Sequence, residues 1–530
     1  MMIFLMKRIL LTFALLYGFV ASAQNHGYSN PVIKGFNPDP SVCRVGDDYY
    51  LVCSSFQYFP GVPLYHSKDL IHWEQIGHVL DRESQILLKD ARSWGGIYAP
   101  TIRHHNGKFY MITTNMSSKG NFIVTTEDPW GEWSDPIWVN MPGIDPSLFW
   151  DDDGRCYYTG ADGGAIFAEI NPDTGELLSE PKRLWNGSGG RNAEAPHIYK
   201  KDGWYYLVLA EGGTEFGHGV TIGRSRNVDG PYESAPHNPI LTHVGRNAQS
   251  NPIQCVGHGD IIQAHDGTWW IVALGVRTQC MMSQHHLLGR ETFLAPVQWE
   301  TDSWPVVNGD GQLFLNMDVP TLQQHPMPIK STEWSFDEKL GPEWLYLRNP
   351  ETERYRIQDG KLKLYGSAIP LKTYEGSTTF VSHRQQDINF SAETYLELKN
   401  AESGDEAGIS LYMDIESHYD IFLQKKGKQN IVTVRYHLGT MEHTIDTKVS
   451  SSKIWLKVSG NSFEYKLSWS ADGINWNEAG QQKACYLSSE TNWGFTGIMI
   501  GLYAYSPCED QLVSENDFHA DFDYFKYKAE

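Results

Sequence analysis

Between about residue 30 and residue 325, short apolar or aromatic runs alternate with clusters of Gly, Pro, Asn and Asp. These turn residues return about every 8–12 positions, which is typical of antiparallel strands joined by tight turns. No stretch of the region keeps the period of about 3.6 residues that marks an amphipathic helix. The pattern therefore predicts an all-β fold.

One strand–turn–strand unit recurs five times in this region. Each copy carries a tight turn, of the Asp-Gly or Asn-Gly type in all but the first, followed by a strand that begins with two aromatic residues. The copies start at residues 39, 99, 145, 195 and 259. A period of roughly 46–64 residues built from hairpins is typical of propeller blades, so we expect a five-bladed β-propeller.

A second β-rich region follows a Pro-rich stretch at residues 320–328. Apolar residues alternate with other residues from Ile454 to Val458, as in a half-buried strand, and Asp472-Gly473 centres a hairpin. Many antiparallel strands over about 200 residues predict a two-sheet β-sandwich. The expected organisation is a propeller over residues 24–319, a linker over 320–330 and a sandwich over 331–530.

The first 23 residues have the features of a cleavable export signal. Lys7 and Arg8 precede an apolar run from Ile9 to Val20, and Ala21-Ser22-Ala23 offers a cleavage site. The run is too short to span a bilayer. We therefore expect an exported protein, periplasmic or secreted, without a membrane span.

The net charge of −21 and the absence of basic runs disfavour nucleic acid or an anionic membrane as partners. The seven cysteines are scattered without a C-x-x-C pair, which argues against a zinc site. Cys43 and Cys53 fall on adjacent predicted strands. They are expected either to pair or to be small buried apolar residues.

The first strand of each blade lines the channel of a propeller, so the starts of the five units should meet at one mouth of it. Four acids lie at these starts: Asp39, Asp145, Glu194 and Asp260. Two facing carboxyl groups, one ionised and one protonated, can hydrolyse a glycosidic bond. A third carboxylate would raise the pKa of the acid. A non-catalytic sugar-binding propeller is the alternative from a different class.

Several motifs at blade spacing resemble those of glycoside hydrolase family 43, a family of inverting enzymes with five-bladed propellers. The second region resembles the concanavalin-A-like, jelly-roll sandwich that accompanies many of its xylosidases and arabinofuranosidases. The matching segments are Gly35-Phe36-Asn37-Pro38-Asp39-Pro40-Ser41, residues 55–61, Ile144-Asp145-Pro146-Ser147, Ala193-Glu194-Ala195-Pro196 and Gly257-His258-Gly259-Asp260.

The resemblance implies a role for each of three acids. Asp39 would be the general base, Glu194 the general acid, and Asp145 the residue that modulates the pKa of Glu194 and orients it. An inverting mechanism would place the base and acid carboxyls roughly 6.5–9.5 Å apart.

The resemblance also suggests residues that contact the substrate. Arg277 would bind substrate hydroxyls, or else form a surface ion pair. Phe36, Trp94 and Tyr98 would form the pocket wall, or else belong to the propeller core. Phe495 would close the pocket from the sandwich. His258 is a candidate neighbour of a metal, a calcium ion held through water, since calcium prefers oxygen ligands. The alternative is a hydrogen-bonded channel histidine. No cofactor is otherwise expected. Asp337 and Asp523 are candidates for a structural calcium site, or solvated surface acids.

The resemblance leaves the sugar open between two pentoses. Residues 94–100 are more similar to the arabinofuranosidase branch, because many xylosidases of the family have Trp where Tyr98 stands. The expected activity is removal of non-reducing-end α-L-arabinofuranose from plant hemicellulose, arabinoxylan or xyloglucan. The alternative is an exo-β-1,4-xylosidase acting on xylo-oligosaccharides. The sequence does not give the oligomeric state.

Overall fold

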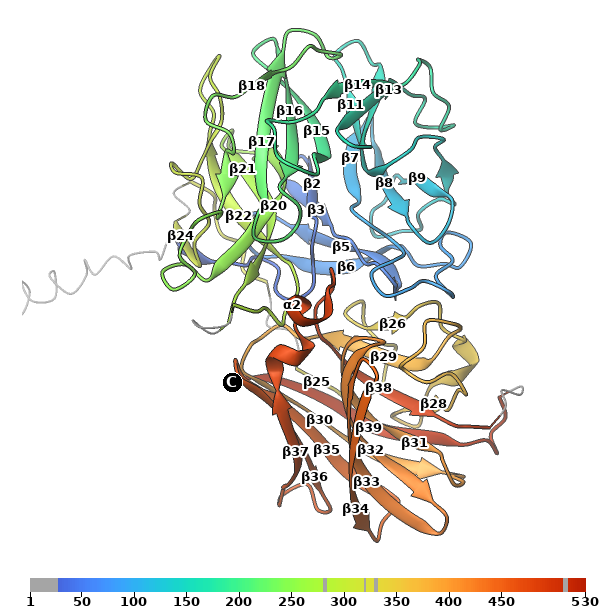
Figure 1. The fold of residues 1–530 in the computed structure, drawn as a ribbon. Coiled ribbons are helices and arrows are strands. Elements are labelled where there is room, and N and C mark those ends of the chain that lie inside the picture. Colours follow the sequence, from blue (N-terminus) through green and yellow to red (C-terminus); the bar gives the residue numbers. More distant parts are fainter. Residues whose placement is uncertain (1–26, 280–283, 319–320, 328–331, 509–512) are drawn as a thin grey trace, which may run out of the picture.

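The structure of the chain is a computed structural model that describes residues 27–279, 284–318, 321–327, 332–508 and 513–530. Strands dominate these residues, and their arrangement confirms the predicted propeller followed by a sandwich (Figure 1). The described helices are short and lie in the second region: η2 (Thr352–Arg354), η3 (Ala484–Leu487) and α2 (Ser489–Asn492). No described helix is long and apolar enough to cross a membrane. The predicted export signal lies outside the described residues.

Each of the five blades is an antiparallel sheet that begins with a strand on the channel. Blade one contains β2 (Ser41–Val45), β3 (Asp48–Val52), β5 (Gly61–Ser67) and β6 (Glu74–Leu80). Blade two contains β7 (Thr101–His105), β8 (Lys108–Asn115), β9 (Gly120–Thr126) and β10 (Ile137–Trp138). Blade three contains β11 (Ile144–Trp150), β12 (Cys156–Ala161), β13 (Ala165–Glu169) and β14 (Lys182–Trp185).

The last two blades complete the ring. Blade four contains β15 (Glu194–Lys201), β16 (Trp204–Glu211), β17 (Gly219–Ser225), β18 (Glu233–Ser234) and β19 (Leu241–Thr242). Blade five contains β20 (Ile253–Gln263), β21 (Trp269–Arg277), β22 (Glu291–Gln298) and β23 (Val306–Val307). The inner strands β2, β7, β11, β15 and β20 contact one another in that order, and β20 returns to β2. A two-stranded sheet of β1 (Gly27–Ser29) and β24 (Asn316–Asp318) joins the two ends of the propeller.

Asp260 connects four of the five blades inside the channel. Its fully buried carboxylate accepts hydrogen bonds from Ser41 (2.7 Å), from Arg103 (2.8 and 3.2 Å) and from the Tyr199 hydroxyl (2.6 Å). Burial by itself raises the pKa of Asp260, but the charge of Arg103 outweighs it and keeps the carboxylate ionised. Asp260 therefore braces the inner strands and does not join the other three acids at the mouth.

The sandwich packs two antiparallel sheets around one apolar core. One sheet contains, in spatial order, β27 (Tyr355–Gln358), β28 (Lys361–Tyr365), β39 (His519–Ala529), β30 (Phe390–Lys399), β35 (Lys453–Gly460), β36 (Glu464–Ser470) and β37 (Asn477–Lys483), with β25 (Glu333–Trp334) beside β39. The other contains β34 (Met441–Val449), β33 (Gln429–Leu438), β32 (Ser417–Lys426), β31 (Glu406–Asp414), β38 (Met499–Tyr505), β29 (Thr379–Arg384) and β26 (Leu345–Leu347). The inward face of β30 is buried at every second residue, as its alternating sequence requires.

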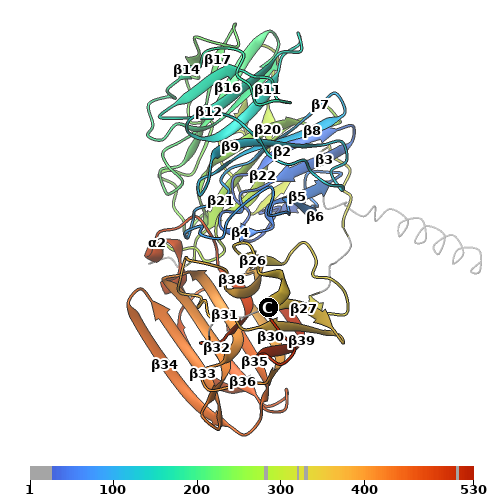
Figure 2. The same ribbon diagram turned by 90° about the vertical axis from the view of Figure 1, so that its right-hand side faces the viewer.

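The second sheet ends on a strand from the propeller. β4 (Tyr58–Phe59), in the connection between β3 and β5, pairs antiparallel with β26. Just beyond this pair, the amide of Arg348 donates to the Gln57 carbonyl at 2.8 Å. The two domains therefore share one sheet where they meet (Figure 2).

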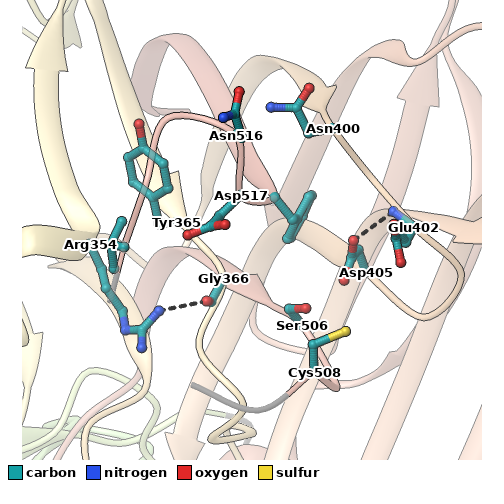
Figure 3. A pocket seen from close by; sticks show the side chains of 12 residues that line it. Arg354, Tyr365, Gly366, Asn400, Glu402, Asp405, Ser506, Cys508, Asn516 and Asp517 are labelled. Atoms are coloured by element: carbon teal, nitrogen blue, oxygen red, sulfur yellow. Dashed lines mark hydrogen bonds between the residues drawn. The ribbon is translucent and has the colours of Figure 1, made fainter. Parts of the chain in front are cut away.

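The sandwich also has a small cavity of about 240 Å³ of its own, where Asp405 accepts a hydrogen bond from the amide of Glu402 (Figure 3). Neither Asp337 nor Asp523 lines it. Asp337 accepts from the Ser335 hydroxyl, and Asp523 pairs with Lys361 at 2.8 Å. The two acids thus take part in separate local interactions, which does not support a shared calcium site.

Both described cysteines of the first blade are free and buried. Cys43 stands opposite Tyr50 in the β2–β3 ladder, whereas the thiol of Cys53 lies 3.7 Å from the Thr292 hydroxyl. They therefore act as small buried residues and do not form the disulfide that was one of the two expectations.

Candidate active site

A cavity of about 600 Å³ lies at the channel mouth that faces the sandwich. The propeller supplies its floor, and residues 489, 490 and 493–495 of the sandwich supply part of its wall. The helix α2, which belongs to this wall, lies where the two domains meet (Figure 1). The cavity is lined by Asp39, Phe56, Tyr98, Ala99, Ile144, Asp145, Arg191, Asn192, Glu194, Thr214, Glu215, Phe216, His218, Cys255, His258, His286, Arg290, Ser489, Glu490, Trp493, Gly494 and Phe495.

The three predicted acids all line this one cavity, and irregular backbone at the start of the inner strands places them there. Asp39 and Asp145 have φ angles of 56° and 52°, and Ala195, next to Glu194, has a φ of 52°. The β11–β12 and β15–β16 ladders both shift register at these points. Such bulges interrupt pairing and redirect side chains, and strained backbone of this kind concentrates at functional sites.

Asp39 is buried and held as a carboxylate. Arg290 donates to it at 2.8 Å, and the Ser54 hydroxyl donates at 2.5 Å. Burial by itself raises the pKa of Asp39, but the charge of Arg290, the nearby His258 and the Ser54 hydrogen bond bring it below its ordinary value. Asp39 is therefore ionised and able to accept a proton.

Glu194 and Asp145 have the opposite tendency. Burial raises the pKa of Glu194, and the negative charge of Asp39 raises it further. Burial also raises the pKa of Asp145 well above its ordinary value, with added repulsion from Glu194 and Asp39. The amide of Ala195 donates a hydrogen bond to Asp145, which ties this acid to the backbone beside Glu194. The pair therefore retains a proton that Asp39 gives up.

His258 lies behind Asp39, with its Nδ1 atom 3.5 Å from the carboxylate. Burial lowers the pKa of His258, so the imidazole is neutral despite the neighbouring carboxylate. Within the described residues, no group of three or more His, Cys, Asp or Glu side chains could hold a metal ion. The donor set thus does not fit a directly bound calcium ion, and calcium held through water stays a prediction.

The predicted aromatic wall is only partly the observed one. Tyr98 and Phe495 line the cavity, and both pack on Phe56, with ring centroids 5.2 and 5.9 Å away. Phe36 is fully buried behind Phe56, and Trp94 packs against Gly494; neither lines the cavity. Phe36 and Trp94 therefore support the wall from behind.

The arginine in the cavity is Arg290 and not the predicted Arg277. Arg277 is held by Glu291, to which it donates two hydrogen bonds at 2.7 and 2.9 Å, and it does not line the cavity. Arg290 follows Gly289 just before β22 and reaches Asp39 and the Thr214 hydroxyl. The sequence repeat covers only the first two strands of each blade. It therefore gives no indication of Arg290, which stands at the start of a third strand.

Other cavity residues were also not predicted from the sequence. Phe56 stands inside the matched segment 55–61 but was not singled out, while Glu490 and Trp493 come from the sandwich next to Phe495. Their proximity to Phe495 in the sequence is the one feature that could have indicated these two residues. Their contribution depends on how the two domains dock.

An ionised carboxylate and a proton-holding carboxyl pair in one half-closed cavity are the groups that hydrolysis of a glycosidic bond requires. The fold and the site together define a glycosidase.

Comparison with known proteins gives the family. Residues 28–305 match the model of glycosyl hydrolases family 43, and residues 334–528 match the beta xylosidase C-terminal concanavalin A-like domain. The chain therefore belongs to glycosyl hydrolase family 43, which confirms both the resemblance and the prediction of a glycosidase.

Relatives align over nearly the full length. The non-reducing end alpha-L-arabinofuranosidase BoGH43B of Bacteroides ovatus is 38% identical, over 95% of this chain and 95% of its own. A xylosidase/arabinosidase of Butyrivibrio fibrisolvens is also 38% identical, over 94% and 98%. The solved structure of the Bacteroides ovatus xyloglucan PUL GH43B has a TM-score of 0.89 and 36% identity, covering 95% of this chain and all of its own.

Replacing Asp145 by Asn should lower the pKa of Glu194. In the variant, Glu194 would lose its proton next to a neutral amide and would no longer be repelled by a neighbouring carboxylate. As the predicted general acid, Glu194 must be protonated for activity, so the basic limb of the kcat/KM profile should move to lower pH. A pH series from 4 to 9 measures this shift. Asp152→Asn, at an exposed site outside the cavity, is the matched control. A basic limb that stays in place would contradict the modulating role.

Proposed function

We propose that this enzyme is an exo-acting, inverting glycosidase that releases non-reducing-end α-L-arabinofuranosyl residues from plant hemicellulose, from side chains of arabinoxylan or xyloglucan. The observation that carries the proposal is that the pKa values of Asp39 and Glu194 are shifted in opposite directions within one cavity. The pKa of Asp39 is lowered and the pKa of Glu194 is raised.

The chemistry assigns one step to each acid. Asp39 removes a proton from a water molecule, which attacks the anomeric carbon from the face opposite the leaving group. Glu194 donates its proton to the glycosidic oxygen as the bond to the leaving sugar breaks. Asp145 shares a proton with Glu194 and disfavours its loss from the pair before the substrate is bound. A single displacement of this kind inverts the anomeric configuration.

Exo action follows from the closed side of the cavity. Phe495 reaches over Phe56 and Tyr98, and its carbonyl accepts hydrogen bonds from Arg290 at 3.4 Å. With one wall built by the sandwich, the site suits a terminal sugar or a single side-chain sugar better than the middle of a long chain.

The assignment to arabinofuranose rests on Tyr98 and on the arabinofuranosidase among the relatives. The alternative, an exo-β-1,4-xylosidase acting on xylo-oligosaccharides, is favoured by the xylosidase/arabinosidase relative and by the xylosidase type of the second domain. Both sugars would use the same three acids.

A rate comparison on aryl α-L-arabinofuranoside and aryl β-D-xylopyranoside tests the sugar. We expect the arabinoside to have the higher kcat/KM; a preference for the xyloside would assign the enzyme to the alternative. Proton NMR of the first product tests the stereochemistry. A product that first appears with retained configuration would contradict the single displacement.

We also propose that the enzyme acts after export, in the periplasm or outside the cell, as the signal-like segment 1–23 suggests.

A further inference from the structure

Trp493 is exposed in a way that its surroundings do not explain. Its side chain is 82% exposed, the highest value among the large apolar side chains of the described chain, yet it lines the catalytic cavity. Within the described residues its indole makes no ring-stacking or cation–π contact. Exposed aromatic surface at the edge of a cavity is typical of a binding site.

The backbone around Trp493 is nevertheless fixed. Its φ is 54°, and its amide donates to the Ser489 carbonyl at 2.8 Å, which ends α2. The next residue, Gly494, lies so close to Trp94 that a Cβ atom would be 2.6 Å from the indole nitrogen. On the other side, Glu490 accepts hydrogen bonds from His286 at 2.6 and 3.1 Å. The two domains therefore hold an unpacked indole at a defined place.

A second exposed aromatic side chain, Phe216, lines the same cavity from the propeller. It is 41% exposed and lies in the loop between β16 and β17. The same loop carries Thr214, which accepts a hydrogen bond from Arg290 at 3.0 Å, and Glu215, which pairs with Arg191. Arg191 and Glu215 are each more than half exposed. We call Phe216 and Trp493 the aromatic rim.

The cavity thus changes character from floor to mouth. Asp39 and Asp145 are 4% and 7% exposed, whereas the aromatic rim and the Arg191–Glu215 pair face solvent. The sugar that is released must occupy the floor, where the acids are. Glu194 protonates the glycosidic oxygen, so the sugar on the other side of that oxygen extends towards the mouth.

We propose that the aromatic rim binds the sugar ring that remains after cleavage, with Trp493 as the main stacking surface. Apolar C–H faces of a pyranose pack on an aromatic ring, and the Arg191–Glu215 pair offers donors and acceptors for the hydroxyl groups. The proposal rests on the proposed function, and it makes the sandwich domain a determinant of substrate choice. The enzyme then distinguishes a pentose linked to a sugar from the same pentose linked to a small group.

The test compares Trp493→Ala with the parent enzyme on two kinds of substrate. One kind has a sugar as leaving group: xylotriose with one arabinofuranosyl side chain, and xylobiose. The other has only a methyl group: methyl α-L-arabinofuranoside and methyl β-D-xylopyranoside. We expect kcat/KM on the accepted sugar-linked substrate to fall about tenfold, mainly through KM, which corresponds to about 1.4 kcal/mol. The matching methyl glycoside should keep the parental kcat/KM.

Two further variants keep the test decisive. Trp493→Phe retains an aromatic ring and should restore most of the parental kcat/KM on the sugar-linked substrate. Phe463→Ala removes an equally isolated ring that is 68% exposed and lies outside the cavity, so kcat/KM should stay at the parental value on both kinds of substrate. Equal losses of Trp493→Ala on both kinds of substrate, or none on either, would overturn the proposal. The proposal would also be overturned if Trp493→Ala changed only the sedimentation coefficient and not the kinetics, because the indole would then contact a second copy of the chain. A parent enzyme inactive on all four substrates would instead contradict the proposed function.

Discussion

Asp39→Asn is expected to lower kcat by about 10³-fold or more, at the upper end of what a general base contributes. Asparagine keeps the size and one acceptor oxygen but cannot take a proton from water. It also removes the charge that faces Arg290 and His258, so the site would gain positive charge without a base. Steady-state kinetics on an aryl glycoside measure the loss, and a thermal melt verifies the fold.

Added azide gives a second measurement for the same variant. An anionic nucleophile needs no base, so azide should restore part of the turnover and yield a glycosyl azide of inverted configuration. Asp153→Asn, in the exposed turn between β11 and β12, is the matched control and should keep the parental rate. Parental turnover by Asp39→Asn would remove this residue from the role of base.

Glu194→Gln is expected to produce a loss that depends on the leaving group. With a sugar as leaving group, kcat should fall about 10²–10⁴-fold, because the glycosidic oxygen would leave without a proton. With dinitrophenolate, which needs no protonation, the loss should be small. Because burial and the charge of Asp39 raise the pKa of Glu194, the basic limb of the parental profile reports its deprotonation. That limb should disappear in the variant.

The control for this variant is Glu233→Gln, at an exposed glutamate on β18 that pairs with Arg224 and does not line the cavity. Its kinetics on both leaving groups should equal those of the parent. Equal losses of Glu194→Gln on the dinitrophenyl and sugar substrates would mean that Glu194 does not act as the proton donor.

The propeller could be predicted because its evidence is local and repeated. Each blade begins with a hairpin whose turn chemistry is visible in a few residues, and five copies reinforce one another. The same repeat placed Asp39, Asp145 and Glu194 in one cavity. It also suggested Asp260 as a fourth acid there, since sequence spacing does not reveal depth along the channel, where Arg103 and Tyr199 hold it.

The rest of the site depends on contacts between segments far apart in the chain. Arg290 and Asp39 are separated by 251 positions, and no local pattern links a residue before β22 to the first blade. The same holds for the sandwich wall: Glu490 reaches His286 only because the domains dock. The family resemblance suggests Arg277 as a substrate contact, but Glu291 in the neighbouring strand lies within reach and binds it.

The strand pair β4–β26 makes the placement of each domain depend on the other. A gene fusion that replaced only the second domain with one from a relative would have to match a foreign sheet to the resident Tyr58–Phe59 edge. A mismatch there would misplace the segment that carries Trp493 and Phe495. Recombination should therefore preserve both halves together, and engineers who exchange specificity between such enzymes will need to move residues 57–59 along with the sandwich.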